Sequence, residues 1–147
     1  MLYFIVKFIH ILLAIVAVGF NASYGVWLAR SDGKPELSAV LQTIRVLDNR
    51  FANPAYGLLL LSGLLLVFVG HLSLTTVWID IGLGLWVVLI AGGVAVYSPT
   101  LRRQIQLAEA GAGAGPEYAA VARRGRLVGM GLGLISLLIV ADMVLKP

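Results

Sequence analysis

Five ionisable side chains lie within or beside long apolar stretches of this chain: Lys7, His10, His71, Asp80 and Asp142. A charge at the centre of a membrane helix costs about 2.5 to 3.5 kcal/mol on insertion scales, so each of these residues needs a chemical or structural reason. An imidazole can bind a metal or heme iron and can relay protons. Intramembrane carboxylates mark ion and proton paths. These residue types suggest a polar cluster near one surface of a membrane.

His10 is the most suggestive of the five because it lies deepest in an apolar stretch. At 100° per residue it shares one narrow stripe with Lys7, Ala14, Ala17 and Asn21. Such a stripe is expected to face the interior of a helix bundle. Two interpretations of His10 follow from this position. It is either a ligand or proton relay, or a structural histidine that makes a hydrogen bond in the core.

The other four residues each have a simpler interpretation beside the functional one. Lys7 can extend its ammonium group to the lipid headgroups. Asp80 and Asp142 lie near helix ends, where water and headgroups reduce the penalty for a carboxylate. His71 lies in a short loop, where a solvated imidazole is ordinary.

Small residues provide a second kind of signal. Gly125, Gly129 and Gly133 recur every four residues, which lets another helix backbone approach closely. A different apolar stretch has two such faces. One carries Asp80, Gly84 and Ala91, and the other carries Gly82 and Gly93. Two small-residue faces on one helix can serve a neighbour in the bundle and a second partner or a flat cofactor.

The elements that hold these residues are apolar runs long enough to cross a membrane. About 20 apolar residues span the hydrocarbon core, and four stretches qualify, at about 2–29, 51–70, 74–97 and 127–145. The third is expected to end before Pro99. An amphipathic helix at about 35–48 is expected to lie on the membrane surface. We therefore expect an all-α integral membrane four-helix bundle that forms a single domain over residues 1–147.

The basic residues predict the orientation of this bundle. Of the eleven Lys and Arg residues, all but Lys7 and Lys146 lie in the two long loops, and the short loop 70–75 has none. By the positive-inside rule, the long loops face the cytoplasm and both termini face outside. This placement explains the net charge of +4 without a nucleic acid. The chain contains no cysteine, which excludes disulfides and thiolate metal sites.

The order and spacing of several segments resemble a known family. These are the opening Lys7-Phe8-Ile9-His10, the run from Leu47-Asp48 through Phe51 and Pro54 to Gly63-Leu64, and the ending from Met143 to Pro147. Over nearly its whole length the chain resembles the bacterial integral membrane proteins grouped as domain of unknown function 2269.

The Lys-x-x-His opening is also similar to that of copper-resistance protein D and of a heme-dependent membrane protoporphyrinogen oxidase. In that oxidase the histidine matching His10 is associated with heme, so the resemblance implies His10 as a candidate ligand of heme b. The oxidase activity does not carry over. This chain reads Ala17-Val18-Gly19-Phe20-Asn21 where the oxidase has a Trp-containing stretch, and its second apolar helix has no basic residue.

These observations favour a small multi-pass protein of the bacterial cytoplasmic membrane, without an evident enzymatic site. We expect it to act as an accessory subunit or structural partner, in contact with the lipid bilayer and with other membrane subunits or a second copy of itself. One alternative is a heme- or quinone-linked redox protein that uses His10. Another is a metal or proton carrier that uses His10, Asp80 and Asp142.

Overall fold

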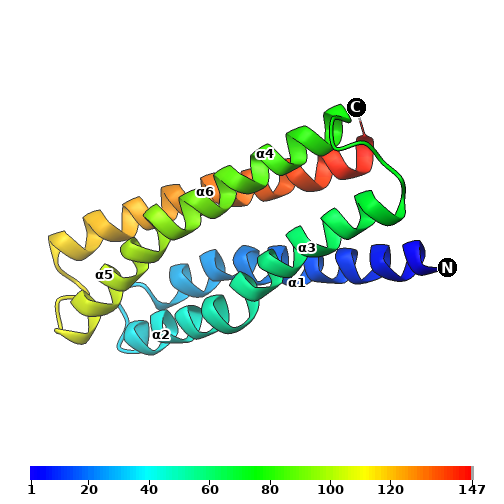
Figure 1. Ribbon diagram of the computed structural model, residues 1–147. Helices are drawn as coiled ribbons and strands as arrows, with labels where there is room; N and C mark the ends of the chain where they lie inside the picture. Colours follow the sequence, from blue (N-terminus) through cyan, green and yellow to red (C-terminus); the bar gives the residue numbers. More distant parts are fainter. Residues whose placement is uncertain (147) are drawn as a thin grey trace.

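The computed structural model describes residues 1–146, and its regular elements are helices (Figure 1). Pro147, the last residue of the expected domain and of the family-like ending, lies outside the described residues. Four helical rods are long and apolar enough to cross a membrane: Leu2–Ser31, Leu37–Val69, Val77–Glu109 and Pro116–Leu145. The all-α, four-helix membrane fold expected from the sequence is confirmed.

Two of the four rods are built from three consecutive elements. The full order is α1 (Leu2–Ser31), α2 (Leu37–Leu47), π-helical η1 (Asp48–Ala52), α3 (Asn53–Val69), α4 (Val77–Gly92), π-helical η2 (Gly93–Tyr97), α5 (Ser98–Glu109) and α6 (Pro116–Leu145). At about 1.5 Å per residue each rod is about 45 to 50 Å long, whereas the hydrocarbon core is about 30 Å thick. Every rod therefore extends beyond the membrane.

The two ends of the bundle differ (Figure 1). One end holds both chain termini and the turn from α3 to α4, and we call it the terminal end. The opposite end holds α2, α5 and the connections that lead into α2 and α6, and we call it the loop end. Most of the basic residues lie towards the loop end. The exceptions are Lys7 and Lys146, which lie near the chain termini at the terminal end.

The rods pair in an antiparallel manner through the membrane. Helix α1 packs on α3, and the Tyr3 ring lies 3.1 Å from the position that a Cβ on Gly70 would take. Helix α4 packs on α6, with Leu132 Cδ2 only 2.9 Å from the corresponding position on Gly92. An apolar cluster centred on Ala17, Tyr56 and Leu89 joins the two pairs.

A second apolar core lies at the loop end. Its buried members come from α1, α2, α5 and α6: Tyr24, Leu37, Leu41, Ile44, Leu101, Ile105, Leu107 and Tyr118. The expectation that the helix near 35–48 lies on the membrane surface is wrong. Its apolar face packs against α1 and α5, so α2 forms one side of this core. It then continues through η1 into α3.

Proline does not end the third rod. The helix was expected to stop before Pro99, but it remains helical to Glu109. A proline removes one backbone donor and pushes away the carbonyl one turn earlier, and the wider π-turn of η2 makes room for this. The Ser98 hydroxyl then donates to the Gly93 carbonyl at 3.0 Å. Pro54 is likewise the second residue of the helix that follows a π-helical turn, here η1.

The fourth rod also begins earlier than hydropathy indicates. Helix α6 starts at Pro116 rather than near 127. Its first turns carry several arginines, so no apolar run marks them in the sequence. They are held by Tyr118, which is buried in the loop-end core, and by a salt bridge from Arg103 to Glu117.

Candidate functional site

His10 is held at the contact between α1 and α3. Its Nδ1 lies 2.8 Å from the Ser62 hydroxyl oxygen, and that hydroxyl donates its own hydrogen to the Leu58 carbonyl at 2.7 Å. While the hydroxyl keeps this bond it accepts from the imidazole, which corresponds to the tautomer with the proton on Nδ1. In that tautomer the other ring nitrogen, Nε2, keeps its lone pair. Donation from one ring nitrogen to a fixed oxygen is the usual arrangement of a metal-ligating histidine.

A glycine on α3 makes room for this imidazole. The His10 Cε1 atom lies 3.3 Å from the position that a Cβ on Gly63 would take. A larger residue there would force the ring to shift. Gly63 was noticed in the sequence only as part of the family-like run, because its role depends on the pairing of α1 with α3.

Asp142 belongs to the contact between α4 and α6. Its side chain is 8% exposed, and its Oδ2 atom lies 3.1 Å from the position of a Cβ on Gly82. Within residues 1–146, this oxygen has no hydrogen-bond partner. Lys146, one turn later, places its ammonium 5.2 Å from the centre of the Trp78 ring.

The structure does not assemble the five ionisable residues into one site. Lys7, His71 and Asp80 are exposed, whereas His10 and Asp142 lie in different helix pairs. No group of three or more His, Cys, Asp or Glu side chains in the described chain is arranged to hold a metal ion. Similar depth therefore did not bring these residues into contact.

The three regularly spaced glycines of α6 have different surroundings. A Cβ on Gly125 would lie 3.1 Å from Gln104 Oε1, and one on Gly129 would lie 3.7 Å from the Tyr97 ring. A Cβ on Gly133 would meet nothing within 4 Å. The close approach of α6 to the third rod thus involves Gly125 and Gly129, and Gly133 faces open space.

The two small-residue faces of α4 are used differently. Gly82 faces α6, where a Cβ would stand 2.4 Å from Met143 Cε, whereas a Cβ on Gly93, expected on the same face, would meet nothing within 4 Å. The neighbouring Gly92 is the glycine that contacts Leu132 of α6. The face that carries Asp80, Gly84 and Ala91 is exposed, and a Cβ on Gly84 would meet nothing within 4 Å. We call this second surface the open face of α4.

A polar network in the membrane was only partly visible in the sequence. Asn21 donates to the Tyr56 hydroxyl at 3.0 Å and to the Ala17 carbonyl at 2.9 Å, which links α1 to α3. Nearer the loop end, Asp48 is buried and receives a long hydrogen bond from Asn53 at 3.5 Å. Tyr56 and Asp48 were missed because a tyrosine near a helix end and an aspartate in a presumed loop are both ordinary.

The comparison with known families agrees with this architecture. The sequence model of the family described as Predicted integral membrane protein (DUF2269) matches residues 4–147. The chain belongs to this family. No curated protein and no solved structure matches this member of the family.

Proposed function

We propose that the protein is a small membrane subunit that binds a transmembrane helix of another subunit through the open face of α4. The observation that carries this proposal is the unequal use of the two small-residue faces. One face is filled by α6, and the other has no packing partner within the described chain. A glycine in a helix costs about 1 kcal/mol relative to alanine. Gly84 incurs that cost without any internal contact that needs a glycine.

The chemistry of the open face indicates what would cover it. Gly84 and Ala91 allow a close backbone approach, and small residues at such spacing favour helix association in lipid. Asp80 lies on the same face in the first turn of α4, at the terminal end. A complementary helix therefore carries small residues along its length and a hydrogen-bond donor or a cation near its outer end. The contact would position a neighbouring subunit rather than carry out a reaction.

The orientation and location of the protein belong to the same proposal. The concentration of Arg and Lys at the loop end supports a cytoplasmic loop end and external termini. We place the protein in the bacterial cytoplasmic membrane, in contact with the lipid bilayer on its remaining faces. The partner helix then meets Asp80 near the outer headgroups.

Replacing Gly84 by leucine is expected to release the protein from its assembly. Leucine keeps the face apolar but blocks close approach, and we expect association to weaken at least about tenfold, which corresponds to about 1.4 kcal/mol. Native mass spectrometry of protein released from native membranes measures this effect. Gly57→Leu is the matched control, because Gly57 is an exposed glycine of α3 that also has open space. If Gly84→Leu stays in the assembly as the wild type does, the open face is not the interface.

One observation favours a second candidate function, a heme- or quinone-linked redox protein. In the tautomer with the proton on Nδ1, Ser62 accepts that hydrogen, and Nε2 is left as the acceptor that heme iron would require. The residues fit one axial ligand. The other histidine, His71, is exposed beyond the end of α3 and does not complete a pair with His10.

A spectrum of the purified protein tests the heme alternative. If His10 binds heme, protein from heme-replete cells shows a Soret band that His10→Ala removes and His71→Ala retains. If His10 is structural, the wild type stays colourless even after hemin is added. In that case His10→Ala lowers the unfolding free energy by about 1 to 3 kcal/mol, because the partner is left unsatisfied. A colourless wild type after hemin addition eliminates the heme alternative.

A further inference from the structure

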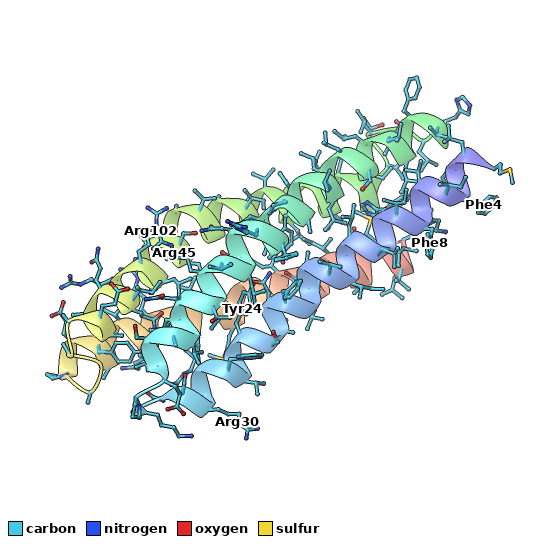
Figure 2. The ribbon with its side chains drawn as sticks, turned by 90° about the horizontal axis from the view of Figure 1, so that it is seen from below. Phe4, Phe8, Tyr24, Arg30, Arg45 and Arg102 are labelled. Carbon is cyan, nitrogen blue, oxygen red and sulfur yellow. The ribbon has the colours of Figure 1, made fainter. Side chains whose placement is uncertain are left out.

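The loop end carries a feature that the proposed function does not use. We propose that Arg45 of α2 and Arg102 of α5 together bind the phosphate of an anionic lipid headgroup in the leaflet at the loop end. Figure 2 shows both residues on the same side of the bundle, near the seam between the two helices. The phosphate would lie on that seam, outside the apolar core.

The register of α2 against α5 supports the placement of both arginines along the contact between these helices. Gln42 of α2 donates to the Glu109 carboxylate of α5 at 2.8 Å, which fixes how the two antiparallel helices meet. Arg45 lies one turn after Gln42, and Arg102 lies two turns before Glu109. From that hydrogen bond both arginines lie in the same direction, towards the membrane. Behind them the core residues Leu41 and Leu101 hold the helices together.

The depth of the two arginines matches the phosphate layer. About 20 helical residues cross the hydrocarbon core, so a crossing that begins at Val69 ends near residue 50. A crossing that begins at Val77 ends near residue 97. Arg45 and Arg102 each lie five residues further on, or about 8 Å beyond the hydrocarbon. The headgroup layer on each side is about 5 to 8 Å thick.

Neither arginine has a carboxylate partner. Among residues 1–146 the single salt bridge joins Arg103 to Glu117, so the charges of Arg45 and Arg102 are not neutralised within the described chain. Both side chains are exposed. Two like charges on one seam favour an anion between them, and the planar guanidinium matches the oxygens of a phosphate. In a bilayer the source that is always present at this depth is a lipid.

The test compares lipid binding by the full-length protein and two matched variants. We expect the wild type in neutral detergent to bind short-chain phosphatidylglycerol at least about tenfold more tightly than phosphatidylcholine. In the double variant Arg45→Gln, Arg102→Gln this preference falls to about one. The control double variant Arg123→Gln, Arg124→Gln removes the same two charges from exposed positions of α6, away from the seam between α2 and α5, and retains the preference. Native mass spectrometry counts the bound lipids.

Two results would overturn the proposal. One is a phosphatidylglycerol preference that survives in the double variant. The other is equal binding of glycerol phosphate without acyl chains, with the same loss in the double variant, because this would identify a soluble anion as the ligand. Thermal unfolding of each variant in mixed micelles of detergent and phosphatidylcholine shows whether the fold is retained. We expect the unfolding temperature to be unchanged, because each glutamine lies on an exposed helix face.

Discussion

Replacing Gly82 by leucine is expected to lower the unfolding free energy by about 1 to 3 kcal/mol, because overpacking a close helix contact forces its neighbours apart. A Cβ alone at this position would stand 2.4 Å from Met143 Cε and 3.1 Å from Asp142 Oδ2. Asp142 is buried against this position, so a leucine also displaces its carboxylate. Thermal unfolding in detergent, monitored by circular dichroism, measures the change.

Gly84→Leu is the control for this experiment. It makes the same change two residues later on the same helix, but there the new side chain meets open space. We expect its stability to equal that of the wild type or to rise slightly, since leucine is the better helix former. Equal destabilisation by both substitutions would contradict the assignment of the two faces of α4. The pair also separates loss of fold from loss of partner binding in Gly84→Leu.

Leu41→Ala is expected to destabilise the protein by about 2 to 5 kcal/mol, the usual cost of removing a large side chain from a packed core. Leu41 is fully buried in the loop-end core, with 0% exposure. Most of this core comes from α2 and α5, beyond the apolar spans expected from the sequence, where water makes apolar burial favourable. Chemical unfolding followed by tyrosine and tryptophan fluorescence measures the effect.

Val46→Ala is the matched control on the same helix. Val46 is 52% exposed, so we expect a change within about 0.5 kcal/mol. If α2 instead lay on the membrane surface, both substitutions would change membrane contact and neither would affect unfolding strongly. A small effect of Leu41→Ala would therefore argue against a loop-end core.

The four membrane crossings could be predicted from the sequence because a bilayer demands about 20 apolar residues in a row. The ends of the rods could not. The first turns of α6 are rich in arginine. The amphipathic helix near 35–48 was expected, but not its unbroken continuation through η1 into α3, and α5 likewise extends the third rod beyond Pro99. Hydropathy does not detect such extensions. Pro99 was misleading because the wider π-turn of η2 accommodates the proline ring within a continuous helix.

The candidate site shows a similar division. The stripe of the first helix identified His10, Ala17 and Asn21, which the structure places towards α3. Their partners Ser62 and Tyr56 depend on which helices pair, and one sequence does not contain that information. The same limit applies to α4. Both faces of this helix carry small residues, and only the position of α6 distinguishes Gly82 from Gly84.

The mass of the wild-type particle released directly from native membranes shows whether another membrane subunit covers the open face of α4. We expect a particle heavier than one chain plus bound lipid, which Gly84→Leu reduces to the single chain and Gly57→Leu leaves intact. If the second component is another copy of this chain, two differently tagged copies purify together, and the assembly is a homo-oligomer. A wild type that leaves the membrane only as a single chain would contradict the claim.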